Sequence, residues 1–151
     1  MIELNPIAIV KNTRKAIEDD HWGEIVSTIH LLEPIREDAF TGIESFSHVE
    51  IIFYFDQVQP DRIETGSRHP RNDPKLPLVG IFAQRGKNRP NQIGATICTL
   101  IGHSGKTITV KGLDALDGTP VLDIKPVMKE FLPREEISQP NWSSELMQNY
   151  W

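Results

Sequence analysis

The sequence predicts a mainly β protein, a compact single-domain antiparallel β-barrel with few short helices. Three observations lead to this fold class. The chain has 151 residues, which is room for one ordinary domain. Its apolar residues gather in short runs rich in β-branched and aromatic side chains, as strands do. Clusters of Gly, Pro, Asn and Asp separate these runs, and helical patterns are scarce.

Seven segments carry the strand pattern. Residues 48–55 are nearly all β-branched or aromatic, as in a strand buried on both faces. Residues 24–32 alternate instead, with Ile25, Ser27 and Ile29 on one side. The seven expected strands are residues 7–10, 24–32, 48–55, 77–84, 94–101, 107–110 and 121–124.

The remaining segments are predicted as turns, helix and tail. Residues 102–105 have the composition of a hairpin turn. Residues 13–20 are expected to form a turn of helix, and residues 143–150 a short helix that Ser143 or Ser144 caps, or else a frayed tail. We therefore expect a barrel domain over residues 1–138 and a helical tail over residues 139–151.

The composition excludes several classes of protein. Cys98 is the only cysteine, so no internal disulfide can form. No apolar run approaches the roughly 20 residues that span a bilayer, and the first residues lack a signal-peptide pattern. The five histidines are scattered, and neither a P-loop nor a dinucleotide-binding glycine motif is present. We expect a cytoplasmic protein without a metal or a membrane partner.

The charge is unevenly distributed along the chain. The whole chain has a net charge of −5, but residues 62–89 carry seven basic side chains against two acidic ones. This +5 segment lies in a chain that otherwise sums to −10. Such an asymmetry can hold a phosphate-bearing partner locally. The alternative is a solvated basic loop.

Residues 69–94 begin with a stretch that two prolines stiffen and end in a dense set of polar groups. Residues 79–82 are apolar and should lie in the core. Arg85, Asn88, Arg89 and Asn91 then follow within seven residues. Arg suits carboxylates and phosphates, and Asn both donates and accepts hydrogen bonds. The loop could therefore fix a ligand, or the Asn side chains could simply close a turn.

Residues 113–126 place two carboxylates at a second turn. Asp114 and Asp117 lie three residues apart, and Gly118 permits a tight turn before the next strand. A carboxylate here could accept hydrogen bonds from ribose hydroxyls or an amine. It could equally close a turn on its own backbone.

Four motifs, in order, resemble the TsaA-like family, whose members are also called VirR-like or TrmO-like. GIFAQRGKNRPNQIG at residues 80–94 resembles the family signature G-[VI]-F-A-T-R-x-x-x-R-P-N-P-I-G. LDALDGTPVLDIKP at residues 113–126 is similar to its second signature, and GIESFSH at residues 42–48 and HPR at residues 69–71 to two shorter motifs. They occur in the family's order and cover most of residues 6–127.

This resemblance implies a small antiparallel β-barrel that forms homodimers and uses S-adenosylmethionine as its cofactor. The substrate implied is N6 of threonylcarbamoyladenosine beside the tRNA anticodon. By position, the expected cofactor-binding residues are His48, Arg85, Ala95, Leu116, Asp117, Gly118 and Thr119. From the basic segment, the candidates for contact with the tRNA anticodon loop are Arg71, Lys87 and Arg89.

Methyl transfer to a substituted N6 releases a proton, so a general base is useful. Asp117 and His48 are the two candidates. A base exposed from the anticodon loop usually stacks on an aromatic ring. The candidate platforms are Trp22, Phe46 and Phe82, of which the two phenylalanines suit the core better.

Two positions depart from the family signature. Gln84 replaces a threonine before Arg85, and Gln92 replaces the second proline of R-P-N-P. They leave a second function open, a non-catalytic module that binds S-adenosylmethionine or a nucleotide and regulates a partner. A third candidate function is a barrel that binds RNA without a cofactor. It is the weaker one, because it leaves the turn at residues 117–120 without a role.

Overall fold

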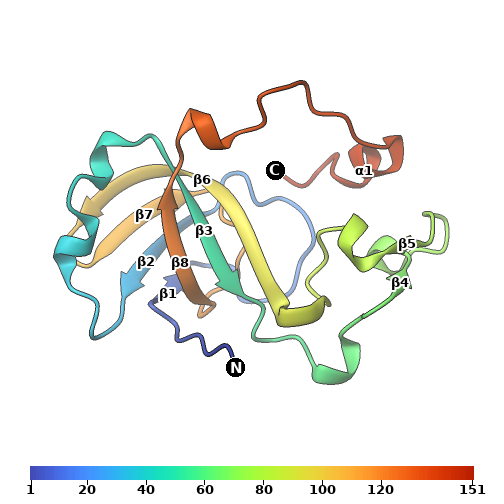
Figure 1. Cartoon of the computed structure of the whole chain (residues 1–151), viewed down its shortest axis with the longest axis horizontal. Coiled ribbons are helices and arrows are strands. Elements are labelled where there is room, and N and C mark those ends of the chain that lie inside the picture. Colours follow the sequence, from blue (N-terminus) through green and yellow to red (C-terminus); the bar gives the residue numbers. More distant parts are fainter.

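Six antiparallel strands close into a barrel in the computed structural model, which describes residues 1–151 (Figure 1). Their order around the barrel is β1-β2-β7-β6-β3-β8, and β8 pairs with β1 to close it. The strands are β1 (Ala8–Lys11), β2 (Val26–Leu31), β3 (His48–Tyr54), β6 (Ile93–Ser104), β7 (Thr107–Lys111) and β8 (Pro120–Pro126). The predicted antiparallel barrel is thus confirmed.

Alternate side chains of each strand fill the barrel interior. In β3, Val49, Ile51 and Phe53 are buried, while His48 and its alternate neighbours are half-exposed. The prediction that this strand is buried on both faces was wrong, because a closed barrel has only one interior. The alternation predicted for β2 is confirmed, with Ser27 and Ile29 buried. The outer face is therefore where functional side chains can gather.

The hairpin between β6 and β7 lies later than the sequence predicts. β6 continues to Ser104, and the turn is made by Gly105 and Lys106. Gly105 has a φ of +58°, in the left-handed region that glycine tolerates. The register shifts between Leu100 and Gly102, so the predicted turn residues take part in a strand with an irregular pairing.

Helices are few and short. The one α-helix, α1, runs over Asn141–Leu146, two residues before the predicted start. The Ser143 hydroxyl donates to the Pro140 carbonyl at 2.7 Å and does not cap the helix. The turn of helix predicted over residues 13–20 is absent. No helix is long and apolar enough to cross a bilayer. The seven 3₁₀ turns are Glu37–Phe40, Ile43–Ser45, Pro60–Arg62, Pro70–Asn72, Ile81–Ala83, Pro90–Gln92 and Lys129–Phe131.

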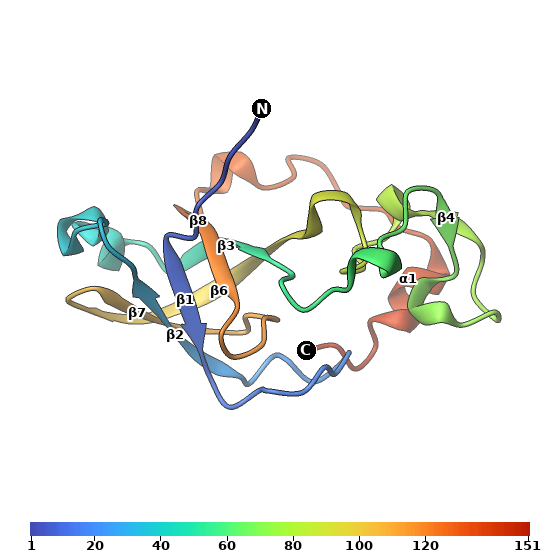
Figure 2. The ribbon, with the colours of Figure 1, turned by 90° about the horizontal axis from the view of Figure 1, so that it is seen from below.

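Residues 56–92 form an arm that projects from one end of the barrel (Figures 1 and 2). Its only strands are β4 (Ser67–Arg68) and β5 (Val79–Gly80), which pair with each other. Ile81 is buried, but Phe82 is 78% exposed, so the prediction that Phe82 lies in the core was wrong. A two-residue strand has too short a ladder to impose the alternation of a long one.

The last residues of the chain fold back against the barrel. The main-chain N–H groups of His21 and Trp22 donate to the carbonyls of Asn149 and Tyr150, at 2.9 and 2.8 Å. Figure 2 shows the C-terminal end beside the loop that follows β1. Residues 149–151 are therefore docked, which rules out the frayed-tail alternative for this segment.

Candidate functional site

A surface hollow of about 350 Å³ lies on the outer face of β3, β6 and β7. His48, Thr99 and Lys111 are cross-strand partners in its floor, and Ile97 lies on the same face of β6. Trp151 forms part of its rim. Its volume is at the small end of the range for pockets that bind small molecules, about 300–1,000 Å³. The hollow therefore combines an imidazole, a hydroxyl, an amine and an aromatic ring.

Arg85 and Ala95, both predicted as cofactor-binding residues, are in contact. The Arg85 guanidinium donates to the Ala95 carbonyl at 2.7 Å. Ala95 lies two residues before Ile97, so both face the outside of the barrel. The Arg85 side chain therefore extends from the arm to the same face of β6 as the hollow. This contact uses one of its five N–H donors, and the side chain is exposed.

The predicted cofactor-binding turn, Leu116 to Thr119, is held by its own hydrogen bonds. The main-chain N–H and the hydroxyl of Thr119 donate to the Leu116 carbonyl at 3.1 and 2.7 Å. The Gly118 N–H donates to the Val10 carbonyl at 2.8 Å, and Gly118 has a φ of +87°. The turn thus packs against the end of β1, and none of its residues lines the hollow.

Asp117 and His48, the two candidate bases, lie in different surroundings. The Asn12 main-chain N–H donates to the Asp117 carboxylate at 3.0 Å, and the Lys15 amine lies 3.4 Å away. These contacts, the Asn12 N–H above all, hold the pKa of Asp117 below its ordinary value. A stabilised carboxylate is a poor proton acceptor. His48 lines the hollow, with its Nδ1 atom 2.6 Å from the Ser47 hydroxyl.

Asp114 receives two hydroxyl donors. Its carboxylate accepts hydrogen bonds from Thr96 on β6 and from Tyr150 in the docked tail. Burial and the Asp114 charge raise the pKa of Tyr150, and burial chiefly raises that of Cys98 to about 12. The sequence named Asp114 only as a turn carboxylate. Its link to the tail depends on a contact between distant parts of the chain, which no local pattern signals.

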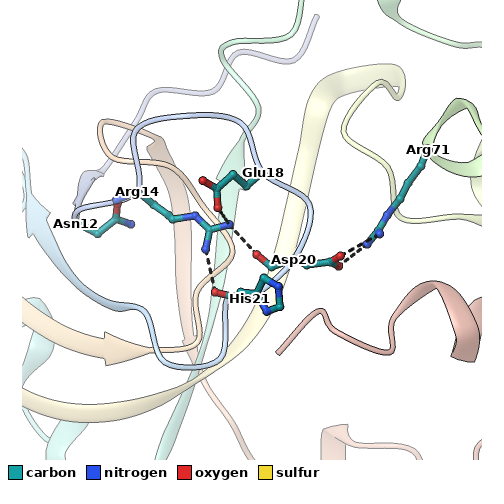
Figure 3. Close-up of polar contacts among 6 residues, drawn as sticks. All are labelled: Asn12, Arg14, Glu18, Asp20, His21 and Arg71. Atoms are coloured by element: carbon teal, nitrogen blue, oxygen red, sulfur yellow. Dashed lines mark hydrogen bonds and ion pairs between the residues drawn. The ribbon is translucent and has the colours of Figure 1, made fainter.

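An arginine network joins the loop after β1 to the arm (Figure 3). Arg14 donates to the carbonyls of Asp20 and His21 at 2.7 and 2.8 Å and forms an ion pair with Glu18. The Asp20 carboxylate accepts from both terminal nitrogens of Arg71, at 2.8 and 3.3 Å. Bidentate pairing of this kind fixes orientation as well as charge. Arg71 is therefore engaged within the protein.

The other two basic candidates differ from each other. Arg89 donates to the carbonyls of Gln84 and Gly86, at 2.8 and 3.4 Å, so it holds the loop of the arm together. Lys87 has no hydrogen-bond or ion-pair partner within the chain through its side chain. Of the three candidates for tRNA contact, Lys87 is the one whose side chain makes no hydrogen bond or ion pair within the chain.

The three candidate stacking rings differ in their exposure to solvent. Trp22 is 4% exposed, and the Arg14 guanidinium lies 4.0 Å from its ring centroid. This cation–π contact covers a face of the ring. Phe46 is half-buried, and Phe82 is exposed on the arm and does not line the hollow. Trp151, which the sequence did not single out, is the one aromatic residue at the hollow.

The two glutamines that depart from the family signature both bind main-chain groups. The Gln84 amide donates to the Arg68 and Val79 carbonyls at 3.1 and 3.3 Å. The Gln92 amide donates to the Phe55 carbonyl at 2.8 Å. Both therefore hold the arm, and neither lines the hollow. No three His, Cys, Asp or Glu side chains cluster as a metal site requires.

Comparison with known families gives a match over residues 15–131. The matching family is the N-terminal domain of tRNA-methyltransferase O. The chain belongs to this family. The match includes β2 to β8, the whole arm and every residue of the hollow except Trp151.

Relatives of this TrmO-type domain occur in bacteria, archaea and mammals. A probable S-adenosyl-L-methionine-binding protein of Methanothermobacter thermautotrophicus is 31% identical over 133 residues, 85% of this chain and 92% of that one. The tRNA (adenine(37)-N6)-methyltransferase of Escherichia coli is 39% identical over 129 residues, 80% of this chain and 51% of that one. The chain spans only 34% and 43% of the length of two other curated relatives.

The fold of the TrmO-type domain is also found in a solved structure. The crystal structure of TrmO from Pseudomonas aeruginosa superposes with a TM-score of 0.72 at 28% identity. The superposition covers 90% of this chain and 61% of that one. The likeness therefore extends over nine tenths of this chain.

Proposed function

We propose that this chain binds S-adenosylmethionine and transfers its methyl group to N6 of threonylcarbamoyladenosine beside the anticodon of tRNA. The observation that carries the proposal is the hollow at His48, Thr99 and Lys111, next to the contact of Arg85 with Ala95. Membership of the TrmO family and relatives named for S-adenosylmethionine binding and tRNA methylation support it.

The residues around the hollow fit the cofactor chemically. The free N–H groups of Arg85 suit a carboxylate, because guanidinium and carboxylate pair through two hydrogen bonds. Thr99 can bind a ribose hydroxyl, and Ile97 offers an apolar surface for the base. In this proposal the Leu116 to Thr119 turn contributes to cofactor binding only indirectly. It holds the loop after β1, whose residue Gly23 borders the hollow.

The bound cofactor would supply a methyl group on a positively charged sulfur, and the protein would position the acceptor and manage its proton. His48 is the one imidazole at the hollow. If its Nδ1–H donates to Ser47, its Nε2 lone pair is free to accept the proton that N6 loses. Asp117, with its lowered pKa, then keeps the loop after β1 in place.

The tRNA would approach along the arm. Residues 62–89 carry the concentrated positive charge, which attracts the phosphate backbone. Lys87 is free for a phosphate contact, whereas Arg71 and Arg89 are committed to Asp20 and to main-chain carbonyls. These two arginines would shape the surface that meets the anticodon loop, and could touch phosphate with their remaining donors.

The proposal includes a homodimer in the cytoplasm, with residues 1–138 as the barrel domain and residues 139–151 as its tail. Two apolar side chains on the barrel surface outside the hollow, Val26 and Ile101, are 50% and 53% exposed. Such a group of exposed side chains suits an interface between copies. Sedimentation of the Ile101→Lys variant tests this, since a dimer through this face would dissociate.

Transfer of labelled methyl from S-adenosylmethionine to tRNA tests the function. The acceptor is tRNA carrying threonylcarbamoyladenosine, with the same tRNA lacking that modification as the control. We expect the His48→Asn variant to lose about 10²–10⁴-fold in kcat while it still binds the cofactor. The Asp117→Asn variant should retain most of its kcat. Cofactor binding without any transfer would favour the regulatory module instead.

A further inference from the structure

Trp151 is placed at the hollow by contacts of its main chain. Residue 23 is glycine, and a Cβ there would lie 2.8 Å from the Trp151 carbonyl carbon. Only a glycine permits this approach of two backbones. The hydrogen bonds from His21 and Trp22 to the preceding carbonyls fix the same segment. The tail is thus fitted to the rim of the hollow.

Tyr150 anchors the segment from the other side. Its hydroxyl donates to the Asp114 carboxylate, which Thr96 also binds. The rings of Tyr150 and Trp151 meet edge to face, with centroids 4.8 Å apart at 85°. Tyr150 is half-buried, whereas Trp151 remains 62% exposed. A ring that is fixed by its neighbours and largely open to solvent can receive a flat ligand.

We infer that Trp151 is the stacking platform for the adenine base bound at this hollow. The inference rests on the proposed function and adds a residue outside the region that matches the family. Adenine could come from the cofactor or from the RNA, and both present the same aromatic face. Stacking of a base on an aromatic side chain contributes about 1–3 kcal/mol, so loss of the ring should weaken binding about 5- to 150-fold.

Binding measurements on the full chain test this inference. The probes are S-adenosylhomocysteine by calorimetry and an anticodon stem-loop RNA carrying threonylcarbamoyladenosine by fluorescence anisotropy. The variants are Trp151→Ala and Trp151→Phe, with Phe131→Ala as the matched control, because Phe131 is 85% exposed and does not line the hollow. We expect Trp151→Ala to lose affinity for at least one probe, Trp151→Phe to restore most of it, and Phe131→Ala to change neither.

The pattern across the two probes distinguishes the outcomes. Loss for S-adenosylhomocysteine alone places the cofactor adenine on Trp151, and loss for RNA alone places the tRNA base there. Unchanged binding of both probes by Trp151→Ala, or a loss that Trp151→Phe does not restore, overturns the stacking role and leaves the proposed function standing. A wild-type chain that binds neither probe overturns both.

Discussion

The barrel and the arm are built from opposite kinds of interaction. Fourteen buried residues form one cluster within the barrel, and its strands share continuous hydrogen-bond ladders. Within residues 56–92, only Pro70 and Ile81 are buried. The arm is instead held by polar side chains that bind carbonyls, such as Gln84 and Arg89.

This difference explains where the site lies. Burial of apolar surface makes the barrel rigid, but leaves few polar groups in its interior for chemistry. The arm supplies Arg85 and Lys87, but has little core to hold them in place. The hollow therefore occurs on the outer face of the barrel, where the arm, the loop after β1 and the tail meet it.

The largest expected effect is in the barrel core. Phe53 is 1% exposed, and Phe53→Ala should lower the free energy of unfolding by about 3–5 kcal/mol, since it removes a large side chain and leaves a cavity. Phe82→Ala, at the exposed phenylalanine of the arm, should change it by less than about 0.5 kcal/mol. Urea unfolding measures both. Equal losses would mean that the arm is as tightly packed as the barrel.

A proline at position 92 should disrupt the arm next most strongly. Gln92 has a φ of +52°, and its main-chain N–H donates to the Arg89 carbonyl at 3.0 Å. Proline cannot adopt this φ and has no N–H, so Gln92→Pro should cost about 3 kcal/mol. Amide hydrogen exchange should speed up within residues 84–93 and not in β2 or β7. The control is Gln92→Gly, which keeps both the φ and the N–H.

A smaller effect is expected where the tail meets the barrel. Tyr150→Phe removes one of the two hydroxyls that bind Asp114, and should cost about 1–3 kcal/mol in the docking of the tail. Faster amide exchange at Trp22, whose N–H bonds the Tyr150 carbonyl, would report it. If exchange there is unchanged, the hydroxyl does not hold the tail.

The smallest effect concerns a surface pair far from the hollow. The hydrogen bond to Glu44 raises the pKa of His103, with a contribution from the Gly105 carbonyl. A raised pKa stabilises the fold fully below the ordinary histidine value, near 6.5, and this contribution is lost as pH rises through the folded-state pKa. NMR titration should find the pKa of His103 lower in Glu44→Gln. An identical value in both proteins would contradict the pairing.

Barrel strands could be predicted because their signal is local. Alternation and β-branching within β2 and β3 follow directly from the side that faces the core. The family motifs likewise named Arg85 and Ala95, which the structure brings into contact. The prediction that Phe82 lies in the core was wrong because β5 is only two residues long, and the alternation of buried and exposed side chains does not extend to residue 82.

The rest of the site depends on contacts between distant segments. Docking of Tyr150 and Trp151 needs the loop after β1 and Asp114, and the tail itself has no unusual pattern. Gln84 and Gln92 could be read only as departures from a motif, since the carbonyls they bind lie 5 to 37 residues away. Such long-range pairs have no periodic signature that a single sequence would reveal.

Amide hydrogen exchange of the full chain with and without S-adenosylhomocysteine would locate the ligand. If the site is the junction of barrel, arm and tail, exchange should slow at residues 20–23, 94–99 and 149–151 on binding. Residues 37–45 and the turn at Gly105 should not change. Protection confined to residues 37–45 and the turn at Gly105 would contradict the placement of the site. So would protection at the Leu116 to Thr119 turn without any at residues 94–99.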